Sequence, residues 1–189
     1  MAYSLARGGF NYAALIVIVT SFEITCRECI IYALTEDRRR MKAFKEKTVK
    51  VGTLIEINFN KEEVIRRMIR SIDFLDLKEN NSIFERVFDF KLKDIADNID
   101  PSVWTLLKLT ILLRHQIVHH GGRVDMLWKQ KFEKILNNMS EEDKNSFRKI
   151  IGEHNLSICE DLTIKMLSNM ESFLNKLLDR IAHELGIAQ

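Results

Sequence analysis

Apolar residues recur at helical spacing along most of this chain. In the most regular stripe, near the C-terminus, they are three or four positions apart and charged residues occupy the opposite face. The stripe comprises Leu162, Met166, Leu167, Met170, Phe173, Leu174, Leu177, Leu178, Ile181 and Leu185. Residues 11–34 form a second long pattern. Its first half is apolar nearly all round, which predicts a helix at the centre of a bundle.

Capping residues mark where further helices begin. Asn60 followed by Glu63 is a capping-box arrangement, and the helix it opens carries apolar residues at helical spacing as far as Leu75. Ser140 precedes three acidic residues and predicts a short helix of its own. These signals indicate several helices joined by short connections.

The middle of the chain carries both start and stop signals. We expect Asn80-Asn81 to interrupt the helical pattern and residues 83–99 to form one or two short helices. Asp100-Pro101 combines a capping residue with a proline suited to the first helical position. The apolar helix that follows should end at Gly121-Gly122, because glycine readily adopts the left-handed conformation that terminates helices.

Composition supports an all-helical fold. The chain has 189 residues, of which 46% are hydrophobic, with one proline and seven glycines. So few helix-breaking residues argue against a turn-rich β fold. Neither an internal repeat nor a linker is apparent, so we predict a single domain over residues 1–189. Its expected architecture is an antiparallel bundle of four to five main helices.

Charge and cysteine content limit the function classes. A net charge of +2 excludes a polycation, so attraction to a nucleic acid must come from a local patch. Three cysteines cannot form a closed set of disulfides, which favours a reducing cytoplasm. Residues 13–19 are too short to span a membrane and lack a signal-peptide cleavage site. Cys26 and Cys29 lie within a predicted helix without a second pair, so we interpret them as half-buried cysteines rather than zinc ligands.

The strongest charge run covers residues 38–50, with seven basic side chains and one acidic one. Such a run is often a solvated helix face. It also supplies what binding to a phosphate backbone needs, so Arg38, Arg39 and Arg40 form a candidate RNA-binding patch.

Residues 113–122 concentrate the chemistry of the chain. Arg114, His115, His119 and His120 precede Gly121-Gly122 at the end of the apolar helix. An arginine holds a phosphate through its planar fork of donors, and a histidine exchanges protons near neutral pH. RNA carries its own nucleophile, the 2′-hydroxyl, so these groups suffice to cleave it without a metal.

The string Arg-polar-x-x-Val-His-x-Gly-Gly, which begins at Arg114, resembles the R-x4-6-H motif of the HEPN superfamily (higher eukaryote and prokaryote nucleotide-binding domains). The resemblance covers residues 113–122 and otherwise concerns helical architecture. It implies a HEPN-like bundle and a metal-independent endoribonuclease of the bacterial toxin or phage-defence type. It also implies a homodimer with two motifs facing one cleft, and an antitoxin or defence-system partner protein. Trp104 and Trp128 are candidates for the dimer interface.

These considerations predict a role for each residue. Arg114 clamps the scissile phosphate, and His119 acts as general base or acid. His115 and His120 provide the complementary proton transfer or contact the substrate. The reaction is expected to need no cofactor. Glu23 either turns outward or orients a motif histidine. The products are expected to carry 2′,3′-cyclic phosphate and 5′-hydroxyl ends.

Several alternatives remain open. On an ideal helix the side chains of Arg114 and His119 point roughly 140° apart, so the two residues do not share one face cleanly. Arg114 would pair with a carboxylate, and the histidines would cap helix carbonyls, in a purely structural role. His115 and His119 have metal-ligand spacing, although Gln116 stands where H-E-x-x-H has its glutamate. The chain would otherwise be a non-catalytic HEPN module that binds RNA, nucleotide or protein, or a helical immunity or adaptor protein.

Overall fold

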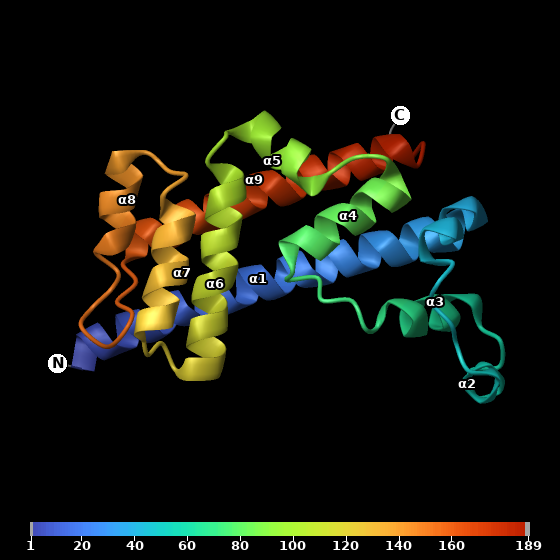
Figure 1. Cartoon of the computed structure of the whole chain (residues 1–189), viewed down its shortest axis with the longest axis horizontal. Coiled ribbons are helices and arrows are strands. Elements are labelled where there is room, and N and C mark those ends of the chain that lie inside the picture. Colours follow the sequence, from blue (N-terminus) through green and yellow to red (C-terminus); the bar gives the residue numbers. More distant parts are fainter. Residues whose placement is uncertain (1, 188–189) are drawn as a thin grey trace. The chain divides into compact units, whose positions relative to one another are not determined.

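The computed structural model describes residues 2–187, with side chains from Gly9 onward, and this part of the chain is all-helical (Figure 1). It contains no β-strand beyond two isolated bridges, which confirms the all-α class. The helices are α1 (Ala2–Glu36), the 3-10 helix η1 (Arg38–Phe44), α2 (Val51–Glu56), α3 (Lys61–Ile69), α4 (Leu77–Phe88), α5 (Leu92–Ile99), α6 (Val103–His120), α7 (Met126–Leu136), α8 (Glu141–Arg148) and α9 (Glu160–Glu184).

The chain divides into two compact units. The first contains the chain up to Phe22 together with Ile95–Asn175, and the second contains Glu23–Asp94 and the chain from Lys176. The division therefore falls within α1 and within α9, and each unit has its own buried side chains. Whether the whole chain behaves as one domain stays a prediction.

Helix α1 is longer than predicted and is buried on one side only. Its fully buried apolar side chains, among them Leu15, Val19 and Phe22, lie three or four positions apart. Between them, Val17 is 64% exposed and Ile24 is 49% exposed. The expectation that the first half of this helix lies at the centre of a bundle was therefore wrong, because a continuous apolar sequence does not determine how many neighbours cover a helix.

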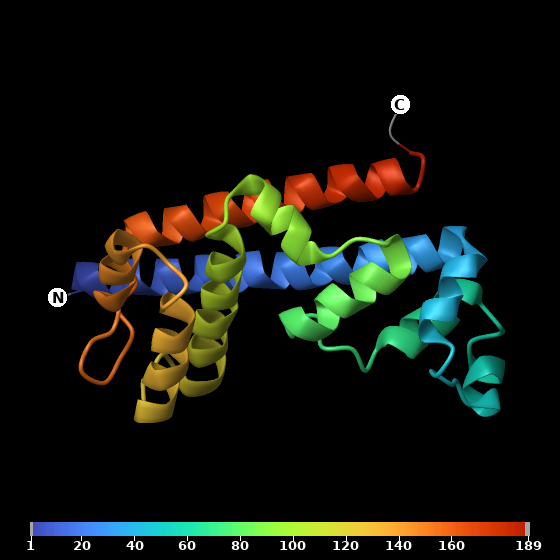
Figure 2. The same cartoon turned by 45° about the horizontal axis from the view of Figure 1, so that its top comes forward.

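The first unit is built on α6, whose apolar side chains pack with those of α7, α8 and α9 in one cluster. The core comprises Leu15, Leu106, Leu109, Leu113, Ile117, Val124, Trp128, Phe132, Leu136, Met139, Phe147, Ile150, Leu156, Ile158, Leu162 and Met166. Helices α6 and α7 run antiparallel, side by side, and the turn after Gly121 joins them (Figures 1 and 2). Helix α7 was not predicted from the sequence, although Asp125 caps it by accepting a hydrogen bond from the Trp128 backbone at 2.8 Å.

The second unit corrects the expected helix break at Asn80-Asn81. Both residues lie inside α4. Asn80 is buried and donates to the Phe74 carbonyl at 3.1 Å, while Asn81 accepts from the Lys93 backbone at 2.9 Å. The Asn80 amide N–H and the Asn81 amide oxygen therefore bond to backbone groups outside α4 and do not compete with its own backbone.

Two of the three capping signals are confirmed, whereas Asp100-Pro101 forms a turn and α6 begins only at Val103. Asn60 accepts from the Glu63 backbone at 2.9 Å, and Ser140 from the Asp143 backbone at 3.2 Å. Helix α3 nevertheless ends at Ile69, short of the predicted Leu75. None of the helices over residues 2–187 is both long enough and apolar enough to cross a membrane.

Candidate functional site

Helix α6 holds the motif in place through buried apolar side chains that lie next to it and within it. Leu113 and Ile117 are buried in the core, whereas His115, His119 and His120 are exposed on the last two turns. Leu113 and Ile117 are four positions apart and therefore lie on the same face of the helix. That face is fixed in the core, and the helix presents the histidines to solvent.

The three histidines form a cluster. The ring centroids of His115 and His119 are 4.6 Å apart, and those of His115 and His120 are 5.8 Å apart. Partial burial lowers the pKa of His115 from its usual 6.5, and the nearby charges of His119, His120, Arg114 and Lys131 lower it further. A neutral His115 at pH 7 is able to accept a proton.

Arg114 lies beside this cluster without a carboxylate partner. Its side chain is half-buried, and the Nε atom is buried without a hydrogen-bond partner. Within residues 9–187, no ion pair involves Arg114, so the alternative in which a carboxylate neutralises it has no support in this structure. Its guanidinium charge is therefore available to an anionic ligand.

Two glycines end α6 as predicted. Gly121 has a φ of 60° and donates to the Ile117 carbonyl at 3.1 Å, while Gly122 has a φ of 76° and donates to the Gln116 carbonyl at 3.0 Å. These backbone groups cap the helix in the manner of a Schellman motif. Capping of these two carbonyls therefore does not require the histidine side chains.

The turn after the glycines is held by contacts from outside it. The Leu156 backbone donates to the Gly122 carbonyl at 2.8 Å, and the Val124 backbone donates to the His154 carbonyl at 2.9 Å. Tyr12 lies against Gly122 and donates its hydroxyl to the Leu156 carbonyl at 2.6 Å. The segment around Leu156 thus fixes the turn that follows the motif.

An open cleft of about 550 Å³ lies at this end of α6. It is lined by Gln116, His119, His120, Gly121, Arg123, Val124 and Asp125. The side chains of Arg114 and His115 do not line it. The structure therefore brings the three histidines together, but it does not place Arg114 and His119 in one cleft of a single chain.

Glu23 and the basic run have other partners. The Glu23 carboxylate pairs with Arg27 at 2.5 Å and belongs to the second unit, so its predicted role toward a histidine stays untested. Arg38 and Arg39 are exposed, although Arg39 also pairs with Asp37 at 3.0 Å.

Arg40 is half-buried rather than freely exposed. Its guanidinium donates to the Val87 carbonyl and, at 3.4 Å, to the Glu184 carbonyl. Arg40 therefore serves the second unit structurally, and the candidate RNA-binding patch depends on Arg38 and Arg39.

Potential metal ligands are not gathered in a suitable arrangement. Within residues 2–187, no group of three or more His, Cys, Asp or Glu side chains is placed to hold a metal ion. Cys26 and Cys29 are buried, more deeply than predicted, and burial raises the pKa of both thiols, that of Cys29 to about 11. Both therefore remain protonated at neutral pH, which disfavours metal binding.

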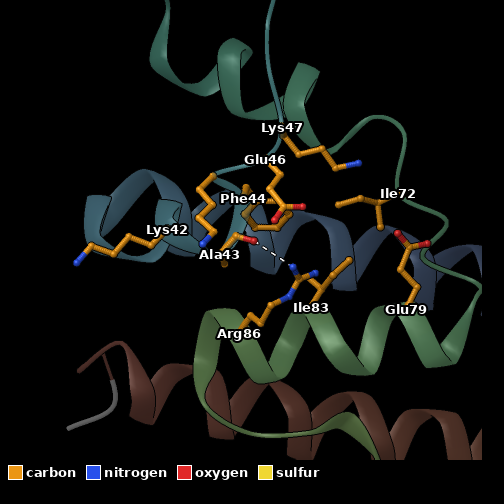
Figure 3. Close-up of a pocket in the computed structure, with 10 residues that line it drawn as sticks. Lys42, Ala43, Phe44, Glu46, Lys47, Ile72, Glu79, Ile83 and Arg86 are labelled. Atoms are coloured by element: carbon orange, nitrogen blue, oxygen red, sulfur yellow. Dashed lines mark hydrogen bonds between the residues drawn. The ribbon is translucent and has the colours of Figure 1, made fainter.

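A second cavity, of about 390 Å³, lies within the second unit between η1 and α4 (Figure 3). Arg86 spans it and donates to the Ala43 carbonyl at 3.2 Å, whereas the Lys42 ammonium extends away from Arg86. Glu46 and Glu79 also line the cavity. This mixture of charges indicates no particular ligand.

Comparison of the chain with protein-family models, curated proteins and solved structures yields no match.

Proposed function

We propose that the protein is a metal-independent endoribonuclease of HEPN type, which acts in the cytoplasm as a toxin or phage-defence effector. The observation that carries this proposal is the exposed histidine cluster at the end of α6 beside an arginine without a carboxylate partner. This combination supplies proton transfer and phosphate binding at one helix end.

In the proposed reaction, a histidine removes the proton from the 2′-hydroxyl of the substrate. The resulting oxygen attacks the adjacent phosphorus, and the bond to the 5′-oxygen breaks as that oxygen receives a proton. We assign His119 to one of these transfers, with His115 or His120 in the other. Arg114 stabilises the charge that develops on the phosphate. The products are a 2′,3′-cyclic phosphate and a 5′-hydroxyl end.

The proposed working unit is a symmetric dimer, because Arg114 and His119 do not line one cleft in a single chain. Trp104 and Trp128 cannot supply the interface as expected, since both are buried in their own unit. Met126 and Leu127, beside the cleft residue Asp125, are 71% and 70% exposed and offer the apolar surface instead.

The second candidate is a non-catalytic HEPN module that binds RNA, nucleotide or a protein partner. The separation of Arg114 from the cleft that His119 lines favours this function, because a binding module needs no shared geometry for proton transfer. Both candidates use the same residues, and a cleavage assay separates them.

The test compares RNA cleavage by the wild type with cleavage by Arg114→Ala and His119→Ala. We expect at least about a 100-fold loss of rate in each, the usual scale for a lost acid–base group. Both side chains lie near the surface, so helical circular dichroism should persist. His154→Ala, which replaces an exposed histidine outside the motif, is the control. Wild-type activity in His119→Ala overturns the catalytic assignment, and binding without cleavage by the wild type supports the second candidate.

A further inference from the structure

We infer that Arg123, outside the Arg114–His119 motif, is a second phosphate-binding residue, which holds the RNA backbone beside the scissile phosphate. This inference depends on the proposed function and adds a substrate contact to it. It involves no covalent step. Arg123 is a substrate-binding residue and Gln116 is the residue that positions it.

The first argument is the composition of the cleft. Among the described residues that line it, Arg123 alone carries a permanent positive charge, and it lies with His119 and His120. Arg114 does not line the cleft. A phosphate that enters toward these histidines therefore meets the Arg123 guanidinium, whose fork of donors matches phosphate oxygens.

The one carboxylate in the cleft has a structural partner. Asp125 accepts a hydrogen bond from the Trp128 backbone at 2.8 Å, as the cap of α7. Within residues 9–187, Arg123 forms no ion pair with Asp125 or with any other carboxylate. The Arg123 guanidinium therefore keeps its capacity to bind an anion.

The second argument is the fixed backbone of Arg123. Its N–H donates to the His120 carbonyl at 3.1 Å, and the residue forms an antiparallel bridge with Asn155. The Arg123 carbonyl accepts a hydrogen bond from the Gln116 side-chain amide. These contacts fix the backbone from which the Arg123 side chain extends, which reduces the entropy lost when that side chain binds a ligand.

Gln116 links the catalytic helix to this residue. Only 4% of its surface is exposed, and its amide reaches from α6 to the Arg123 carbonyl. Gln116 directly follows His115 in the sequence, so it belongs to the same turn of α6 that presents the histidines. The glutamine therefore fixes the position of Arg123 relative to the histidine cluster.

Equilibrium binding tests the inference without cleavage. The probe is a fluorescein-labelled 2′-O-methyl RNA, whose blocked hydroxyl prevents strand scission, titrated with full-length protein at several salt concentrations. Arg123→Ala should raise Kd by about tenfold, the scale of one charge-assisted contact, and reduce the magnitude of the salt slope by about 0.7. Arg123→Lys should recover part of the affinity. Arg70→Ala, which removes an exposed arginine of the second unit, should leave both quantities unchanged.

The outcomes separate the inference from the proposed function. If the wild type cleaves RNA and Arg123→Ala binds the probe as Arg70→Ala does, the inference is overturned and the ribonuclease remains. If the wild type neither binds nor cleaves RNA, both are overturned. Weakened binding in Arg123→Ala, with cleavage restored at higher RNA concentration, supports a substrate-binding role.

The positioning role of Gln116 has its own readout. Gln116→Met keeps the approximate volume and removes the donor to the Arg123 carbonyl. It should weaken probe binding in the wild type but add little in the Arg123→Ala background, because both changes remove one contact. A purely structural glutamine would lower the thermal midpoint equally in both backgrounds without altering probe affinity, and that result overturns the positioning role.

Discussion

The imidazole rings of His115 and His119 lie one turn apart on α6, with their centroids separated by 4.6 Å. A positive charge on His119 at this distance disfavours the protonated form of His115. The pair therefore has a measurable consequence for pH dependence.

We predict that His115 titrates below its usual pKa of 6.5, because burial and neighbouring positive charges disfavour its protonated form. Lys131→Gln should raise the pKa of His115 by removing one such charge, whereas Lys149→Gln, whose charge is not among those that act on His115, should not. NMR titration of the imidazole Hε1 resonance measures both effects. A His115 pKa at or above 6.5 contradicts the prediction.

The same shift predicts how His115 affects stability. Its pKa is lower in the folded chain than in the unfolded chain, so the unfolded state binds the proton more tightly. The contribution of His115 to stability is therefore complete above pH 6.5 and declines as the pH falls from 6.5 through the folded pKa. Denaturant unfolding of the wild type and His115→Gln should show this difference only at acidic pH.

Cleavage should not depend on a divalent metal, since the proposed chemistry uses only histidine and arginine side chains. We expect full activity in excess EDTA and products with 2′,3′-cyclic phosphate ends, identified by mass spectrometry. A known metal-dependent nuclease, inactivated in the same buffer, is the control. Loss of activity that zinc or manganese restores would favour a metal role for His115 and His119.

Substitution of Arg38 and Arg39 should affect RNA binding, whereas substitution of Arg40 should affect the stability of the fold. Arg38→Glu with Arg39→Glu should weaken RNA binding and flatten its salt dependence, because fewer counterions are released. Arg40→Ala should instead lower the free energy of unfolding by about 1–3 kcal/mol, since it leaves the partly buried Val87 and Glu184 carbonyls without this donor. Fluorescence anisotropy and urea denaturation distinguish these effects. If the salt slope of RNA binding is unchanged in the double variant, Arg38 and Arg39 belong to a merely solvated surface and do not bind RNA.

Gly122 should tolerate no side chain. A Cβ there would lie 3.2 Å from the Tyr12 hydroxyl, and the φ of 76° disfavours L residues. Gly122→Ala should therefore reduce the free energy of unfolding by about 1–3 kcal/mol. Gly9→Ala, where a Cβ meets nothing within 4 Å, is the control. Tyr12→Phe also removes the hydrogen bond to the Leu156 carbonyl, so it costs stability by itself, but the loss in the Gly122→Ala, Tyr12→Phe double variant should be smaller than the sum of the two single losses because the hydroxyl is the nearest contact. Equal stability of Gly122→Ala and Gly9→Ala would contradict the prediction.

Light scattering should report about twice the chain mass of 22.2 kDa. Leu127→Glu should shift the protein toward a monomer, whereas Ile164→Glu, at a side chain that is 53% exposed on α9, should not. If each site draws Arg114 and His119 from different chains, mixing the two inactive alanine variants should restore part of the activity. A monomer that cleaves at the full rate at nanomolar concentration would exclude the shared cleft.

The sequence determined the all-α class and several helix ends because these depend on local chemistry. Asn60 and Ser140 supply their caps within one turn of the backbone they bind, and Gly121 requires no neighbour to adopt its left-handed conformation. The regular apolar stripe of α9 likewise needs only the helical repeat.

The tertiary structure decided what depends on distant partners. Asn81 lies within α4 while its amide oxygen accepts from the Lys93 backbone, and Arg40 donates to the carbonyls of Val87 and Glu184. The sequence identified Arg114 and the histidines by type and spacing. It gave no sign of Arg123, whose link to Gln116 forms only when the chain turns back after Gly121. Such contacts form only where the folded backbone brings separate parts of the chain together. The periodicity of side chains along a single helix does not encode that path.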